Sequence, residues 1–227
     1  VSSRRVAEAL ALTIPVFGLL GIPLLIGIDT IFAWTEPYGL VDRKVAYLNV
    51  EFFLVRYVIY FVVWSWLALA LYRRSTRQDE TGDHRLTLGM QAISAPGLLI
   101  FAITITMFAF DFLMSLEPEW FSTIFGVYYF AGSVVGTVAF MILLLMGLQQ
   151  VGKLTGNVVT REHYHDYGKL LFAFSIFWAY IGFSQYMLLW YANIPEATAW
   201  FMHRASDFAP YGWNVISAAL VVGHLIV

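Results

Sequence analysis

Long apolar stretches follow one another along this chain, and they constrain its fold more than any other feature of the sequence. Hydrophobic residues make up 60% of the 227 residues, and charged residues only 12%. An average soluble domain carries about 25% charged residues, so a soluble fold would leave much of this apolar surface in water. A helix that crosses a bilayer needs about 20 apolar residues. The composition therefore predicts an all-α, polytopic membrane protein.

Six of these stretches are long enough to predict transmembrane spans. They cover about residues 6–28, 50–72, 96–116, 120–148, 169–192 and 211–227. Pro15 and Pro23 should bend the first span, because proline removes a helical hydrogen bond. The chain is interpreted as a single membrane domain. It starts at Val1 and stops inside an apolar run, so we expect it to be part of a longer subunit.

Lysine and arginine divide unequally between the two sides of the predicted membrane. One side carries Arg4, Arg5, Arg73, Arg74, Arg77, Arg85, Lys153, Arg161 and Lys169. The other side carries Arg43, Lys44 and Arg204. Positively charged loops stay in the cytoplasm. The first side, with the N-terminal end and loops 73–95 and 149–168, is therefore predicted to be cytoplasmic, and loops 29–49, 117–119 and 193–210 to lie outside.

Asp111 is the one ionisable residue in the apolar run 98–116, and Arg56 lies about two turns into the second predicted span. A charge inside a bilayer costs several kcal/mol unless it finds a partner, faces protein or is neutralised. Helix direction puts both residues about 8–10 Å below the outer edge at 1.5 Å per residue. Two interpretations remain open: a structural ion pair that sets helix register, or a proton carrier at Asp111.

Further residues are candidates for the same proton path. Glu51 marks either its outer mouth or simply the solvated interface. Tyr180 and Ser184 share one stripe of the fifth predicted span, where they hold either water or a neighbouring helix. His224 in the last span is a relay group or a structural histidine, and His165, Asp166 and Lys169 form a titratable cluster at the inner mouth or a solvated loop.

Cofactor sites are not indicated in this chain. It has no cysteine, which removes thiolate metal sites, iron–sulfur ligation and covalent haem attachment. A haem between membrane helices generally needs paired histidines, whereas only His224 lies within a predicted span, which argues against a cytochrome b-type subunit. There is no glycine-rich phosphate loop and no basic nucleic-acid patch.

Two longer segments carry a family resemblance. They read FDFLMSLEPEWFSTIFGVYYFAG (110–132) and YHDYGKLLFAFSIFWAYIGFSQYMLLWYANIPE (164–196), about a quarter of the chain. These segments resemble the F subunit of bacterial alternative complex III, a quinol:cytochrome c (or other periplasmic acceptor) oxidoreductase of respiratory or photosynthetic electron transport. The F subunit is related to the membrane anchors of polysulfide and nitrite reductases.

The resemblance implies a subunit of roughly ten helices, of which this chain would be a part, in the bacterial cytoplasmic membrane. It implies no redox cofactor in this chain, with haem c and iron–sulfur clusters in partner subunits and quinol oxidation mainly on the homologous C subunit. The implied role is to stabilise the membrane arm, with proton conduction as an added possibility. A direct quinone-binding anchor and a purely structural scaffold are the alternatives.

Overall fold

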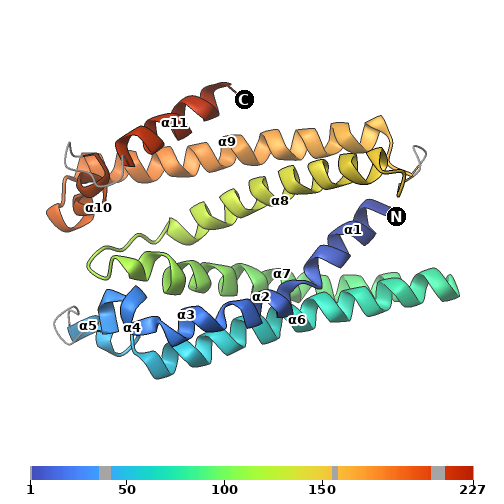
Figure 1. Ribbon diagram of the computed structural model, residues 1–227, viewed down its shortest axis with the longest axis horizontal. Coiled ribbons are helices and arrows are strands. Elements are labelled where there is room, and N and C mark those ends of the chain that lie inside the picture. Colours follow the sequence, from blue (N-terminus) through green and yellow to red (C-terminus); the bar gives the residue numbers. More distant parts are fainter. Residues whose placement is uncertain (1, 36–41, 155–157, 206–212, 227) are drawn as a thin grey trace.

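A computed structural model describes residues 2–35, 42–154, 158–205 and 213–226 (Figure 1). Every regular element in these ranges is helical, which confirms the predicted all-α class. Five helical segments are long and apolar enough to cross a membrane. They are Ser3–Ile26, Val50–Thr81, Arg85–Leu116, Phe125–Gln150 and Arg161–Ala192. The chain is a multi-pass membrane protein by this measure.

The first span is broken into four short helices. Two of its three breaks lie just before the predicted prolines, and the third lies at Gly27. Its pieces are α1 (Ser2–Ala11), α2 (Ile14–Leu20), α3 (Ile22–Ile26) and α4 (Ile28–Ile31), followed by the 3-10 turn η1 (Ala33–Thr35). Pro15 and Pro23 stand in the first turns of α2 and α3, where no helical N–H is missed. The segment runs beside the helix Val50–Thr81, where the Tyr57 hydroxyl donates a hydrogen bond to the Gly18 carbonyl.

The second and third spans form a long helical hairpin of α6 (Val50–Thr81) and α7 (Arg85–Phe112), preceded by the short α5 (Asp42–Val45). Asn49 caps α6 by accepting a hydrogen bond from the Phe52 N–H at 2.9 Å. Gly82 ends the helix in the left-handed region, with φ of 67°. The predicted 73–95 loop is therefore wrong. Its charged residues are good helix formers that carry both helices beyond the apolar region.

The connection between α7 and α8 (Phe125–Gln150) is longer than the predicted 117–119. It contains the 3-10 turn η2 (Met114–Leu116), and α8 starts five residues later than expected from the apolar run. Trp120 explains the difference, because this buried apolar residue belongs to the connection rather than to a span. Its indole N–H donates to the Ala197 carbonyl at 3.1 Å, and its ring stacks on Trp200.

The connection between α8 and α9 is shorter than the predicted loop 149–168, because α9 runs from Arg161 to Ala192. A capping box opens this helix: the Thr160 N–H donates to Nδ1 of His163 at 3.2 Å. The predicted loop 149–168 is therefore wrong in its second half, and His165, Asp166 and Lys169 lie on the first turns of α9. The helix ends at Asn193, which takes a left-handed φ of 47°.

The last two helices are α10 (Pro195–Ala205) and α11 (Trp213–Ile226). Within the described ranges α11 has 14 residues, fewer than the roughly 20 that a span requires. Among the described residues, five helical segments reach the length of a span. The predicted sixth span, 211–227, begins and ends outside the described residues.

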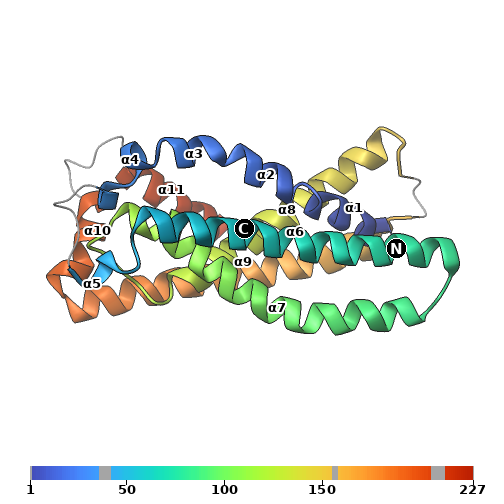
Figure 2. The ribbon, with the colours of Figure 1, turned by 90° about the horizontal axis from the view of Figure 1, so that it is seen from below.

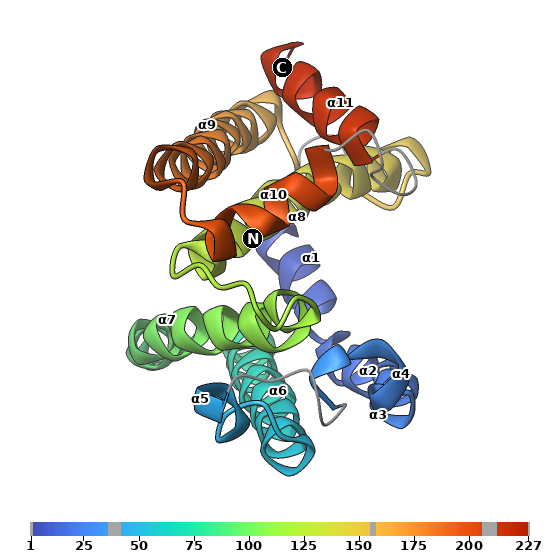
Figure 3. The same cartoon turned by 90° about the vertical axis from the view of Figure 1, so that its left-hand side faces the viewer.

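The long helices pack in chain order as two antiparallel pairs, α6 with α7 and α8 with α9, joined by contacts between α7 and α8 (Figures 1 and 3). The N-terminus, the α6–α7 turn and the α8–α9 connection lie at the same end of the bundle (Figures 1 and 2). This arrangement gathers the arginine-rich segments of the sequence at one end, called the basic end below. The opposite end holds α5, η2 and α10.

Candidate functional site

Asp111 and Arg56 form an ion pair in the interior of the protein, between α6 and α7. Arg56 Nε lies 2.8 Å from Oδ2 of Asp111, and Nη2 lies 3.0 Å from Oδ1. The side chains are 8% and 1% exposed, respectively. Two parallel N–H···O bonds between a guanidinium and a carboxylate give the strongest geometry available to such a pair. Arg56 and Asp111, which helix direction places at a similar depth, are thus in direct contact.

Tyr60 completes the coordination of the carboxylate. Its hydroxyl donates to Oδ2 of Asp111 at 2.6 Å. Tyr60 stands four residues after Arg56, so both side chains point from the same face of α6. Ser115 donates to the backbone carbonyl of Asp111. The two carboxylate oxygens therefore accept three hydrogen bonds, and the site has the geometry of a fully paired carboxylate.

The guanidinium of Arg56 is enclosed on its other sides by aromatic residues. Its Cζ atom lies 4.0 Å from the ring centroid of Tyr47 and 4.3 Å from that of Phe52. Its Nη1 donates to the Tyr47 carbonyl at 3.0 Å. A cation over an aromatic face gains about 0.5–2 kcal/mol, with the larger values where water is excluded. Arg56 thereby joins α6, α7 and the segment that precedes α6.

Tyr47, which lies before the second span, responds electrostatically to this cluster. Burial raises the pKa of its hydroxyl, and the nearby charge of Asp111 raises it further. Its hydroxyl lies 3.7 Å from Sδ of Met107. Tyr47 therefore stays a neutral phenol at pH values well above the ordinary pKa of tyrosine. It adds no second negative charge to the site.

A second polar contact lies deeper in the same α6–α7 interface. The Trp64 indole N–H donates to Oγ1 of Thr104 at 2.8 Å. Thr104 in turn donates to the Ile100 carbonyl within its own helix. Thr104, Asp111 and Ser115 are all buried, as their shared helical face predicts. Polar groups of this interface are thus paired between helices, which is how membrane bundles satisfy them.

The remaining candidate residues do not join this cluster. Glu51 is exposed on the first turn of α6. Tyr180 is 64% exposed and Ser184 half-buried on α9, which α8 separates from the α6–α7 pair (Figure 3). Among the described residues these side chains form no hydrogen bond with the Arg56–Asp111 pair, and the path through them stays a prediction. The side chain of His224 lies outside the described residues.

The cluster of His165, Asp166 and Lys169 is exposed and does not contact the Arg56–Asp111 pair. Asp166 and Lys169 form an exposed pair at 3.3 Å on α9, three residues apart. His165 is exposed on the same turn. Among the described residues no group of three His, Cys, Asp or Glu side chains is arranged to hold a metal ion.

Two members of the site, Tyr60 and Tyr47, were not predicted from the sequence. Tyr60 had an available signal, since it follows Arg56 by one helical turn. Tyr47 had none, because its position over the guanidinium depends on the reversal of the chain before α6. The sequence places Tyr47 outside the membrane helix, nine residues before Arg56.

No protein-family model matches this chain, and no curated protein matches it significantly. The fold and the site therefore define its class directly: a multi-pass helical membrane protein whose second and third spans are joined by a buried arginine–aspartate pair.

Proposed function

We propose that this chain is a membrane subunit, without a redox cofactor of its own, of a quinol:electron acceptor oxidoreductase of the alternative complex III type. In this role it stabilises the membrane arm of the complex. The observation that carries the proposal is the closed Arg56–Asp111–Tyr60 cluster, which lies at the start of the FDFLMSLEPEW segment. Such a cluster fixes the register of two helices rather than presenting a reactive group.

The two segments that carry the family resemblance also contact each other in the fold. Residues 110–132 form the end of α7, the connection and the start of α8, whereas 164–196 form most of α9 and the start of α10. Tyr128 stacks on Trp178 with ring centroids 5.5 Å apart. Trp120 of the first segment also donates to the carbonyl of Ala197, the residue that directly follows the second segment. A single packed unit therefore contains both resembling segments, which supports a shared structural role.

A structural role fits the bonding of Asp111 better than proton transport does. A proton carrier must exchange its proton with water or another group. The donors to the Asp111 carboxylate among the described residues are the side chains of Arg56 and Tyr60. The ring of the neighbouring Phe112 packs against Phe53 and Phe108. Breaking a buried ion pair costs about 3–5 kcal/mol, because one charge loses its partner.

The surface of the bundle suits membership of a larger assembly. The span within α9 buries only 11% of its most apolar window, and Phe172, Ile176, Phe183 and Trp190 are exposed along it. Lipid and neighbouring subunits are the proposed partners of this surface. The proposed neighbours include a homologous quinol-binding C subunit, haem c subunits and an iron–sulfur subunit. The proposed location is the bacterial cytoplasmic membrane, with the basic end in the cytoplasm.

The test is to replace Asp111 in the intact complex and to follow assembly and turnover separately. Asp111→Asn should reduce co-purification of the chain with haem-bearing and iron–sulfur subunits, because Arg56 is left buried and unpaired. The double variant Arg56→Asp, Asp111→Arg should recover part of the assembly. Asp166→Asn is the matched control, since its pair with Lys169 is exposed, and it should leave assembly unchanged.

The same variants distinguish a proton role from a structural one. If Asp111→Asn assembles normally but alters proton translocation linked to quinol oxidation, Asp111 is a proton carrier and the register-lock proposal fails. If the chain purifies alone, without haem-bearing or iron–sulfur partners, its proposed membership of the complex fails whatever Asp111 does.

A quinone site is the second candidate function, and one cavity favours it. This cavity, of about 360 Å³, lies between the end of α7, α8 and α9, and its walls include Phe125, Tyr128, Tyr129 and Trp178. Flat aromatic walls with phenol groups suit a quinone ring. Asp111 does not line it, so this pocket is separate from the ion-pair cluster. Crosslinking of a photoreactive quinone to α8 would favour this function, and exclusive crosslinking to the C subunit would exclude it.

A further inference from the structure

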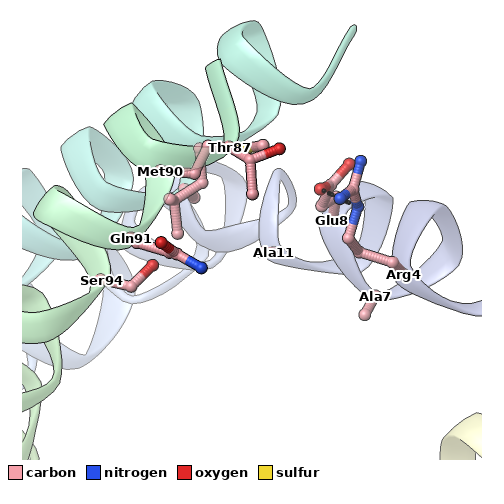
Figure 4. A pocket seen from close by; sticks show the side chains of 10 residues that line it. Arg4, Ala7, Glu8, Ala11, Thr87, Met90, Gln91 and Ser94 are labelled. Atoms are coloured by element: carbon pink, nitrogen blue, oxygen red, sulfur yellow. Dashed lines mark ion pairs between the residues drawn. The ribbon is translucent and has the colours of Figure 1, made fainter. Parts of the chain in front are cut away.

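A second cavity, of about 460 Å³, opens at the basic end between α1, α6 and α7. Figure 4 shows its two opposing walls: Arg4, Ala7, Glu8 and Ala11 from α1 on one side, and residues of α7 on the other. It is separate from the Arg56–Asp111 cluster and from the aromatic cavity. None of the functions considered above uses it.

The cavity is held open by polar contacts that fix α1 against α6. Arg4 donates from Nη2 to Oγ of the buried Ser75 at 2.8 Å, and its Nε lies 3.2 Å from Glu8. Arg5 pairs with both Glu8 and Asp79, and its guanidinium lies over the Tyr72 ring. These contacts anchor the N-terminal helix, so the space beside it is a defined part of the fold.

Arg4 keeps binding capacity after these contacts are made. A guanidinium has five N–H donors, of which two are used here. The Arg4 side chain is 46% exposed at the rim of the cavity. Glu8 also lines the cavity and offsets part of the charge of Arg4. Within α1 and residues 73–85 six arginines outnumber four acidic residues, so this end keeps a net positive charge that favours an anion over a cation.

The opposite wall presents polar groups that lack a protein partner. Gln91 and Ser94 follow Thr87 at helical spacing on α7 and line the cavity with it. Thr87 accepts a hydrogen bond from Gln78 at 2.6 Å. The Gln91 amide and the Ser94 hydroxyl make no hydrogen bond within the described part of the chain, so they are available to an occupant.

The rest of the wall is apolar, with three alanines and the larger Leu71 and Met90. Ala7 and Ala11 face it from α1, Ala68 from α6 and Met90 from α7. The cavity therefore combines a cationic side chain at its rim with amide and hydroxyl groups and with apolar wall residues. The sequence places the polar lining residues at the membrane edge, because Gln91 and Ser94 immediately precede the apolar run 96–116 and Arg4 precedes the run 6–28.

We propose that this cavity binds an anionic phospholipid of the adjacent leaflet. The phosphate meets Arg4 at the rim, the glycerol ester carbonyls accept hydrogen bonds from Gln91 and Ser94, and an acyl chain covers the apolar part of the wall. This set of groups matches the head group, glycerol and acyl chain of a phospholipid, and basic pockets between membrane helices at the cytoplasmic surface bind anionic head groups. The proposal does not depend on which complex the chain belongs to.

Native mass spectrometry of the purified full chain in detergent tests this assignment, with phosphatidylglycerol and phosphatidylcholine of identical acyl chains as probes. The wild type should bind phosphatidylglycerol at least about fivefold more tightly, the effect of one well-placed arginine. Arg4→Gln should abolish this preference. Gln91→Leu and Ala7→Leu should weaken both lipids alike, because the glycerol and acyl contacts are common to the two.

Arg161→Gln is the matched control, since it removes one charge from the same end but far from the cavity in the sequence, on α9. It should leave the preference for phosphatidylglycerol intact, and circular dichroism should show that every variant keeps its helices. Equal binding of the two lipids by the wild type would overturn the proposal, as would equal loss with Arg161→Gln and Arg4→Gln. Competition by inorganic phosphate alone, or selective retention of a quinone in place of phospholipid, would overturn it too.

Discussion

Asp111 shows how a membrane helix keeps a carboxylate without exposing it to water. Three hydrogen bonds from Arg56 and Tyr60 replace solvent at its two oxygens. The cation, in turn, rests between two aromatic rings and a backbone carbonyl. The cost of burying each charge is thus offset by bonds that exist only when α6, α7 and Tyr47 are in place. Specificity of packing, more than net stability, is what such a pair supplies.

At the same scale, Tyr47 predicts a dependence of stability on pH. Its pKa is raised in the folded protein by burial and by Asp111. The neutral phenol is therefore favoured by folding, and the stabilisation it contributes is complete below about pH 10 and declines as pH rises further. Thermal unfolding in detergent, compared between pH 9 and pH 11, should show a smaller alkaline loss for Tyr47→Phe than for the wild type.

Tyr180→Phe is the control for this measurement, because Tyr180 is 64% exposed on α9. Its alkaline loss should equal that of the wild type. An alkaline loss in Tyr47→Phe as large as in the wild type would show that Tyr47 does not control this dependence.

At the scale of elements, two glycines of α8 have different surroundings. A Cβ at Gly126 would collide with the Thr106 side chain of α7, whereas a Cβ at Gly136 would meet nothing within 4 Å. Gly132 is intermediate, since its Cβ would lie 3.1 Å from Nε1 of Trp178. Close approach of α8 to its neighbours therefore depends on particular glycines rather than on glycine content.

This contrast predicts opposite effects for two identical substitutions in one helix. Gly126→Ala should lower the free energy of unfolding by about 1–3 kcal/mol, because the added methyl group overpacks the contact between α7 and α8. Gly136→Ala should raise it by up to about 1 kcal/mol, because alanine is the better helix former. Unfolding of each variant in mixed micelles measures the difference. The same sign for both would contradict the assigned contact.

At the scale of the whole molecule, the two ends of the bundle differ in charge. The ends of α1, α6, α7 and α9 that carry arginines lie at the basic end, although they are far apart in the sequence (Figure 1). At the other end Lys44 donates to the Pro118 carbonyl, and burial lowers its pKa while Glu119 acts in the opposite direction. This asymmetry is the basis for placing the basic end in the cytoplasm.

The absence of cysteine in the sequence makes this topology directly testable. His84→Cys introduces a thiol on the exposed turn of the basic end, and Thr123→Cys introduces one in the exposed connection at the opposite end. A membrane-impermeant maleimide added to intact spheroplasts should label Thr123→Cys and leave His84→Cys unlabelled until the cells are lysed. The reverse pattern would invert the orientation, and the protein without introduced cysteine reports background labelling.

The apolar runs by themselves determined the class of this protein and the approximate position of its spans, because runs of about 20 apolar residues match the thickness of the hydrocarbon region when they are helical. Pro15 and Pro23 likewise determined where the first span breaks, since their chemistry is local. Helix ends were less predictable. Hydropathy marks where a helix leaves the apolar region, whereas α6, α7 and α9 continue through charged residues to the caps that end or begin them.

The sequence predicted which two residues could form the ion pair, but not that they do. Direction and depth made Arg56 a possible partner of Asp111, but whether two helices touch depends on side-chain packing that no single segment encodes. Only the tertiary structure decided that α6 and α7 meet there, that Tyr60 and Tyr47 join the pair, and that α9 with Tyr180 and Ser184 lies apart. The physical reason is that local sequence sets helix formation and membrane depth, whereas a buried site needs the simultaneous packing of segments distant in the chain.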